Sequence, residues 1–227
     1  MLITRLLRDL FSSTRNPMGS SPQPANRDAG DSGERYSFTV DWFSPCIPAW
    51  SELLSHTPEI GKVLEIGSYE GRSAVWLIEN AFKAGGKGEM YCIDTWKGSM
   101  EHDAAEMPAV EKRFLRNIAA ARAGSRSDVN VHVLKGSSSA LLASLVSEGH
   151  TLSFDLIHVD GSHECPDVLS DLVLSVQLCK IGGLILCDDY DYDETKLAID
   201  SFVNCYRHKL MQTGCNGRQI YFKKTAA

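Results

Sequence analysis

Short apolar runs alternate with longer amphipathic segments from residue 62 to the end of the chain. A strand followed by a helix and then by another strand builds a parallel sheet with helices on both faces, so this alternation predicts an α/β fold. Open sheets of this class bind ligands at the carboxyl ends of their strands, so the informative side chains should follow each strand. The predicted strands are 62–66, 89–93, 129–134, 154–159, 183–187, 210–213 and 219–222. The predicted helices between them are 73–84, 109–122, 139–146, 167–178 and 195–206.

The composition is ordinary for a globular protein and excludes few functions. The chain has 227 residues, 43% of them hydrophobic, which suits one domain with extensions. Its net charge of −6 argues against nucleic acid as the main partner, because phosphate binding needs a basic surface. No apolar run approaches the roughly 20 residues that cross a bilayer. The seven cysteines lack Cys-x-x-Cys spacing, so we expect free thiols in a reducing cytoplasm and no zinc site.

The first 35 residues differ in character from the rest of the chain. Residues 1–12 are short and amphipathic, and such a segment could dock on a membrane surface or on a partner, or have no specific role. Residues 13–35 are rich in Ser, Pro, Asn, Gly and Asp, which predicts a disordered linker. We therefore expect the folded domain to span residues 36–227.

The first predicted strand ends in a glycine turn, Glu65-x-Gly67-x-x-x-Gly71. A glycine directly after the strand permits a tight turn and a close approach of the backbone to a ligand. The helix that follows offers free N–H groups at its start. Tyr69 occupies the position of the second glycine in the dinucleotide pattern G-x-G-x-x-G, so a pyrophosphate would be blocked there.

An acidic residue, Asp94, follows the second predicted strand, 23 residues after Gly71. An aspartate in this position can accept hydrogen bonds from both ribose hydroxyls of a nucleoside. The alternative is an aspartate that caps the turn before Thr95. Together with the glycine turn, its position favours a nucleoside ligand.

Three more aspartates follow the fourth and fifth predicted strands. Asp160 ends the fourth, and Asp188 and Asp189 end the fifth. If these strands are neighbours, the three carboxylates lie close together and repel one another unless a positive charge lies between them. A divalent cation with oxygen ligands is the simple solution, and we expect Mg²⁺, or Mn²⁺ or Ca²⁺ in its place. The alternative is that the aspartates only end strands and cap loops.

Two histidines lie near this acidic set. His163 follows Asp160 by three residues and could be a general base, a metal ligand or a structural hydrogen-bond donor. His158 lies within the predicted strand, which favours a packing role in the core. An aromatic segment at 42–50 precedes the first strand and could form one wall of an acceptor pocket or a helix that packs on the sheet.

The combination of V-L-E-I-G-S-Y-E-G-R-S, Y-C-I-D-T-W-K-G, F-D-L-I-H-V-D-G-S-H and G-G-L-I-L-C-D-D-Y resembles the class I methyltransferases over about residues 38–223. More narrowly, it is similar to the branch with macrolide-sugar O-methyltransferases and cephalosporin-biosynthesis methyltransferase-like proteins. This resemblance implies a Rossmann-like, doubly wound, seven-stranded and mostly parallel sheet with the last strand antiparallel. It implies S-adenosylmethionine at the glycine turn, its ribose on Asp94, and its adenine near Gly136 and Ser137. The cofactor-binding residues that we expect are Glu65, Gly67, Ser68, Tyr69, Gly71, Ser73, Asp94, Thr95, Trp96, Gly136, Ser137 and Asp160.

The same resemblance implies a metal-assisted O-methyltransferase in which Asp160, Asp188 and Asp189 hold the cation. There the metal binds the acceptor hydroxyl, and Asp160 or His163 takes its proton. The resemblance favours a sugar hydroxyl on a glycan or a glycosylated small molecule as acceptor. The alternatives are a metal-independent methyltransferase, a non-catalytic protein that binds the cofactor or a nucleotide, and, remotely, a nicotinamide dehydrogenase. A homodimer is compatible with the exposed apolar residues expected before the first strand.

Overall fold

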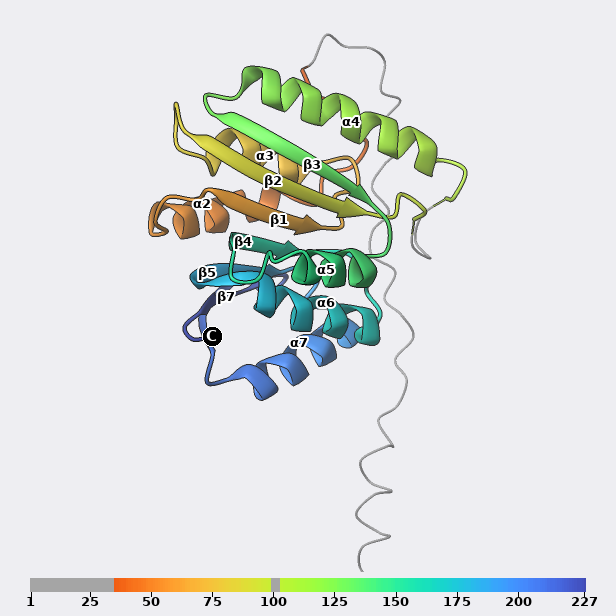
Figure 1. Cartoon of the computed structure of the whole chain (residues 1–227). Helices are drawn as coiled ribbons and strands as arrows, with labels where there is room; N and C mark the ends of the chain where they lie inside the picture. The colour runs from red at the N-terminus through yellow and green to blue at the C-terminus, as the bar shows by residue number, and fades with distance from the viewer. Residues whose placement is uncertain (1–34, 99–102) are drawn as a thin grey trace, which may run out of the picture. The chain divides into compact units, whose positions relative to one another are not determined.

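A computed structural model describes residues 35–98 and 103–227, and in them the strands form one seven-stranded sheet (Figure 1). The strand order is β3-β2-β1-β4-β5-β7-β6. Neighbours among β1 to β5 pair in parallel, whereas β7 runs antiparallel to β5 and β6, which confirms the predicted sheet. The strands are β1 (Lys62–Ile66), β2 (Lys87–Asp94), β3 (Asp128–Lys135), β4 (Phe154–Val159), β5 (Cys179–Cys187), β6 (Leu210–Cys215) and β7 (Ile220–Lys224).

Helices cover both faces of this sheet (Figure 1). One face packs against α2, α3 and α4, and the other against α5, α6 and α7. A short 3-10 helix, η1 (Ser44–Cys46), leads into α2. The α-helices are α2 (Ile47–Ser55), α3 (Arg72–Asn80), α4 (Met107–Gly124), α5 (Ser138–Ser147), α6 (Cys165–Leu178) and α7 (Asp193–Tyr206).

The central strands are apolar on both sides because both of their faces are buried. In β1, Val63 belongs to the core under α2, α3 and α4, while Leu64 belongs to the core on the opposite face. Successive side chains of a strand point to opposite faces, so an uninterrupted apolar run fills two cores at once. For this reason the central strands are recognisable in the sequence as continuous apolar runs, and not as an alternation of apolar and polar residues.

Several element boundaries differ from the prediction by one to four residues, and strand pairing explains three of these differences. The strand β5 begins at Cys179, although the prediction started it at residue 183, because the strand continues through Gly182 and Gly183 with a register shift against β4. The helix α3 ends at Asn80, and Phe82 then forms a bridge with Ile60. The strand β6 extends into the predicted turn at 214–217 through a second register shift. Each boundary is set by a pairing partner distant in sequence.

The sheet brings the carboxyl ends of β1, β4 and β5 to one edge, since β4 lies between β1 and β5. All seven cysteines are free thiols, and four of them are buried. Within the described ranges, each helix is too short or too polar to span a membrane. The predicted amphipathic start and linker, residues 1–34 of the 1–35 segment, lie outside the described residues, and both remain predictions.

The buried carboxyl group of Asp171 in α6 should make the stability of the protein depend on pH. Burial raises the pKa of Asp171 from 3.8 to about 6, and neither carboxylate oxygen has a hydrogen-bond partner among the described residues. A raised pKa in the folded state means that stability is full below about pH 4 and is lost as the pH rises through 6. We expect Asp171→Asn to raise the free energy of unfolding by up to about 3 kcal/mol at pH 8 and to change little at pH 4.

Urea denaturation at both pH values measures this effect. The control is Asp128→Asn, which changes an exposed carboxylate at the start of β3 and should give no pH-dependent gain. An equal effect of Asp171→Asn at pH 4 and pH 8 would contradict a buried carboxyl group whose pKa is raised by its surroundings.

Candidate active site

The turn after β1 can be built only with glycine at two positions. Gly67 has a φ of +86°, and a Cβ atom there would lie 1.7 Å from the main-chain oxygen of Asp160. Gly71 has a φ of +80°, and a Cβ atom there would lie 2.9 Å from the ring of Phe114. Both positions therefore exclude larger residues, for conformational and for steric reasons. The backbone at the end of β1 is thereby packed directly against the end of β4.

Glu65 supports this turn from inside the protein. Its side chain is fully buried and accepts hydrogen bonds from Ser68 Oγ at 2.8 Å and from Ser73 Oγ at 2.6 Å. These three predicted cofactor residues thus lie together, with Ser68 and Ser73 also buried. The contacts hold the turn to the start of α3, so the buried Glu65 side chain fixes the shape of the turn.

Asp94 joins the turns that follow β1 and β2. Its Oδ2 accepts the backbone N–H of Tyr69 at 2.8 Å, and its Oδ1 accepts that of Trp96 at 2.6 Å. The indole N–H of Trp96 in turn donates to the main-chain oxygen of Tyr69 at 2.9 Å. Tyr69 and Trp96 both have a φ of +46°, a strained conformation for non-glycine residues that is commonest at functional sites.

The carboxylate of Asp94 is therefore both a turn cap and a candidate ligand for ribose. Each carboxylate oxygen has two acceptor positions, so both can also accept a hydroxyl group. The other predicted nucleoside residues are close by, because Gly136 N donates to the main-chain oxygen of Asp94 at 2.9 Å. Ser137 is exposed at the start of α5, and Thr95 is partly buried beside Asp94. A glycine-only turn next to such a carboxylate fits the adenosyl part of S-adenosylmethionine.

The acidic edge lies at the ends of β4 and β5, which are neighbours as predicted. The backbone N–H of Asp188 donates to the main-chain oxygen of Val159 at 3.0 Å, which holds the two strand ends together. One oxygen of Asp160, one of Asp188 and one ring nitrogen of His158 all lie within 4.8 Å of one another. Asp189 is adjacent and buried, with a φ of +53° that turns the backbone at this point.

An arginine that the sequence analysis missed lies in this acidic edge. Arg218 Nε donates to Asp188 Oδ1 at 3.0 Å, and its Nη2 lies 3.4 Å from Asp189 Oδ1. The next residue, Gln219, donates its amide N–H to Asp188 Oδ2 at 2.8 Å. Both residues precede β7, and an antiparallel strand starts where its parallel neighbour ends. A search that included the starts of antiparallel strands would have found them.

The electrostatics at this edge suit a positively charged ligand. Burial, together with the charges of Asp188 and Asp189, raises the pKa of Asp160 well above its usual range, and Arg218 opposes that shift. A raised pKa means that the ionised form of Asp160 is disfavoured by its surroundings. An additional cation beside Asp160 would relieve this cost.

The two histidines occupy different environments. His163 Nε2 lies 2.8 Å from Asp189 Oδ2, and the side chain remains one-third exposed, so it can exchange protons with solvent. His158 is buried as predicted, edge-on to Trp50 with ring centroids 4.8 Å apart. Its Nε2 nevertheless has no hydrogen-bond partner among the described residues. A role in packing alone does not explain why a polar nitrogen is buried at this position.

Comparison with known proteins identifies the family. A family model described as a methyltransferase domain matches residues 64–190, more than half of the chain. The chain belongs to this methyltransferase family. The match begins in β1 and ends just after the acidic pair at 188–189, so it covers the glycine turn, Asp94 and the acidic edge. A search of curated proteins gives no match.

Solved structures share the fold of this methyltransferase at low sequence identity. The O-methyltransferase NovP superposes with a TM-score of 0.51 at 14% identity, over 80% of this chain and 77% of NovP. The TDP-rhamnose 3′-O-methyltransferase CalS11 gives 0.53 at 16% identity, over 82% of each chain. MycE, a methyltransferase from the mycinamycin pathway, gives 0.53 at 15% identity, over 82% of this chain but 51% of MycE. At these identities the likeness concerns the class I methyltransferase fold.

The aromatic segment at 42–50 was expected either to pack on the sheet or to form one wall of an acceptor pocket, and its residues differ in this respect. Phe43 and Trp50 are buried in the core under the methyltransferase sheet, as a packing helix requires. Trp42, in contrast, is 41% exposed and lies against Tyr69 of the glycine turn, with ring centroids 5.3 Å apart. An aromatic pair therefore stands beside the candidate cofactor turn.

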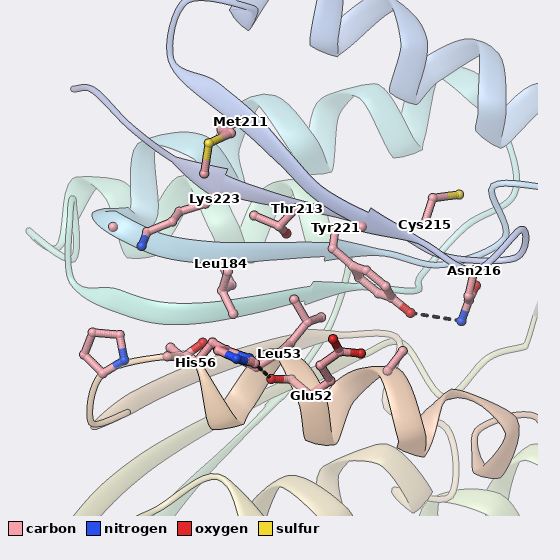
Figure 2. Close-up of a pocket in the computed structure, with 15 residues that line it drawn as sticks. Glu52, Leu53, His56, Leu184, Met211, Thr213, Cys215, Asn216, Tyr221 and Lys223 are labelled. Carbon is pink, nitrogen blue, oxygen red and sulfur yellow. Dashed lines mark hydrogen bonds between the residues drawn. The ribbon is translucent and has the colours of Figure 1, made fainter.

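A groove of about 400 Å³ lies on another part of the methyltransferase, between α2 and the strands β5, β7 and β6 (Figure 2). Its lining includes Glu52, His56, Met211 and Lys223, and it contains none of the predicted site residues. Figure 2 shows the Tyr221 hydroxyl accepting a hydrogen bond from Asn216 at one end of this groove. The candidate active site is therefore the strand-end edge and not this groove.

Proposed function

We propose that this methyltransferase transfers a methyl group from S-adenosylmethionine to a hydroxyl group, on a sugar or a glycosylated small molecule, with the help of a divalent cation. The observation that supports it most is the shared role of Asp160. Its main-chain oxygen packs against Gly67 of the glycine turn, while its carboxylate belongs to the acidic edge. The candidate donor site and the candidate acceptor site therefore meet at one residue.

The residues of the chain would act mainly by positioning. The glycine turn and Asp94 orient the methyl donor, and the acidic edge orients the acceptor, so that the methyl group moves in line from sulfur to oxygen. The hydroxyl proton goes to Asp160 or to His163. His163 is suited to pass it on, because its ring is partly exposed and is paired with Asp189.

The donor set at the acidic edge fits a divalent cation. Asp160 and Asp188 offer carboxylate oxygens, and Gln219 holds Asp188 in place. A bound divalent cation would lower the pKa of an acceptor hydroxyl and fix its position. Mg²⁺ is the ion that carboxylates alone favour, with Mn²⁺ or Ca²⁺ as substitutes.

Two structural neighbours support the choice of acceptor and cation. CalS11 is described as a TDP-rhamnose 3′-O-methyltransferase, and MycE was solved in complex with Mg, SAH and mycinamycin VI. We extend a sugar hydroxyl and a divalent cation to this chain on that basis. The cytoplasmic location, the homodimer and the division of the chain at residue 36 remain part of the proposal.

Removal of divalent cations should abolish the activity. We expect EDTA treatment to reduce S-adenosylhomocysteine release, measured over a panel of sugar and glycoside acceptors, by at least about 100-fold, because the acceptor hydroxyl loses its activating charge. Addition of Mg²⁺ or Mn²⁺ after removal of EDTA should restore it. Activity that chelation leaves unchanged would favour metal-independent transfer, and binding of S-adenosylmethionine without turnover of any acceptor would favour a non-catalytic role.

A further inference from the structure

We infer that the cation site consists of His158, Asp160 and Asp188, and that its nitrogen ligand makes it select a first-row transition ion such as Mn²⁺ over Mg²⁺. This inference rests on the proposed function, which assigns a cation to this edge, and it changes the third ligand from Asp189 to His158. It also changes the preferred metal. Three independent features of the edge support it.

The first feature is the orientation of His158. The ring is 1% exposed, its Nδ1 lies 3.4 Å from Glu65 Oε1, and its Nε2 lies 3.9 Å from Asp188 Oδ2. A distance of 3.9 Å is too long for a hydrogen bond, so Nε2 is a buried polar atom without a partner among the described residues. With the proton on Nδ1, facing Glu65, Nε2 directs its lone pair at the acidic edge. A cation between this lone pair and the two carboxylates would compensate all three groups at once.

The second feature is the support around the ring. Metal-binding histidines almost always donate their other ring N–H to a carboxylate or a carbonyl, which fixes the ring and makes it more basic. Glu65 is in that position, since it is paired with His158 in the register of β1 and β4. Trp50 packs edge-on to the ring and donates to Gln219, the residue that also holds Asp188. The ligands are thus held by residues of β1, of α2 and of the turn before β7.

The third feature is that Asp189 is already engaged. Its Oδ2 lies 2.8 Å from His163 Nε2, and its Oδ1 lies 3.4 Å from Arg218 Nη2. Both oxygens therefore face donors of the protein itself. Arg218 also binds Oδ1 of Asp188. Oδ2 of that residue accepts one hydrogen bond from the Gln219 amide at 2.8 Å and also faces His158 Nε2, and its second acceptor position can bind a cation. The guanidinium therefore lies against the Oδ1 atoms of Asp188 and Asp189, whereas the inferred cation site uses His158, Asp160 and Oδ2 of Asp188.

The donor set determines the metal. Carboxylate and water ligands suit Mg²⁺ and Ca²⁺, whereas imidazole suits transition ions, whose affinity for nitrogen rises along the first row. A site with one imidazole and two carboxylates should therefore bind Mn²⁺ more tightly than Mg²⁺. This difference separates the inferred site from one made of three aspartates.

The direct test is Mn²⁺ binding to the full-length chain. Titration followed by the EPR signal of free Mn²⁺ gives the affinity, and pulsed EPR of bound Mn²⁺ detects a directly bonded ¹⁴N nucleus. We expect one site, displaced by Mg²⁺ only at much higher concentration, with a ¹⁴N signal from His158. Absence of Mn²⁺ binding, or a bound ion without a ¹⁴N signal, would overturn the inference without the need for any variant.

Matched variants identify the third ligand. His158→Gln should weaken Mn²⁺ binding by at least about tenfold and remove the ¹⁴N signal, whereas Asp189→Asn should change the affinity by less than about threefold. The opposite pattern, with Asp189→Asn the damaging change, would restore the three-aspartate site and overturn ours. Circular dichroism and thermal unfolding of each variant establish that it is folded before its metal binding is compared.

The test of the cation site and the test of the proposed function can fail separately. Mn²⁺ binding with a ¹⁴N signal in a protein that turns over no acceptor would support the site and contradict O-methyl transfer. Acceptor turnover that EDTA does not affect, together with absent Mn²⁺ binding, would support methyl transfer and overturn the site.

Discussion

Replacing Gly67 with alanine should weaken S-adenosylmethionine binding by more than about 100-fold, which corresponds to about 3 kcal/mol. A Cβ atom at this position would lie 1.7 Å from the main-chain oxygen of Asp160, a contact that backbone atoms must move to relieve. The positive φ of +86° adds a conformational cost of about 1–3 kcal/mol for any other residue. The turn would therefore move away from the end of β4. Isothermal titration calorimetry with S-adenosylmethionine measures the loss.

Gly149→Ala is the matched control for this change. Gly149 also has a positive φ, of +89°, but a Cβ atom there meets nothing within 4 Å. It therefore carries the conformational cost without the collision, and it lies outside the candidate site. We expect it to lose some stability and to bind the cofactor normally. Binding by Gly67→Ala within about threefold of the unchanged protein would contradict a cofactor site at this turn.

Replacing Asp94 with alanine should have the second-largest effect, a loss of S-adenosylmethionine affinity of about 100-fold or more. The carboxylate accepts backbone N–H groups from Tyr69 and Trp96, and hydrogen bonds to charged groups contribute about 1.5–3 kcal/mol each. The variant loses these contacts together with the proposed ribose contacts. Asp128→Ala, at an exposed position that starts β3, should leave the affinity unchanged.

A ligand without a ribose hydroxyl separates the two roles of Asp94. If Asp94 binds the ribose, Asp94→Asn should weaken S-adenosylhomocysteine by more than it weakens the 2′-deoxy analogue, because the analogue has already lost that contact. Equal losses for the two ligands, measured by calorimetry, would show that Asp94 acts only as a turn cap, the alternative that the sequence left open.

The sequence predicted the sheet well because its signals are local. Both faces of β4 are buried, so its apolar run was recognisable without knowledge of its neighbours, and its bounds were predicted without error. The start of β5 was missed by four residues, since Gly182 and Gly183 resemble a break until the pairing with β4 is known. Local patterns predict which segments are strands, whereas strand ends depend on partners distant in the chain.

Some residues of the candidate site could likewise be predicted from local sequence, whereas others depend on strand pairing. A glycine after the first strand and a carboxylate after the second are properties of single positions, so the glycine turn, Asp94 and the acidic residues at the strand ends could be predicted without the fold. Only the tertiary structure placed Arg218 against Asp188, 30 residues away, because that contact exists only when β7 pairs antiparallel with β5. It also decided that His158 faces Glu65 and Asp188, since the face of a strand residue depends on register with its neighbours. The sequence fixes which groups follow each strand, but strand pairing decides which of them share one site.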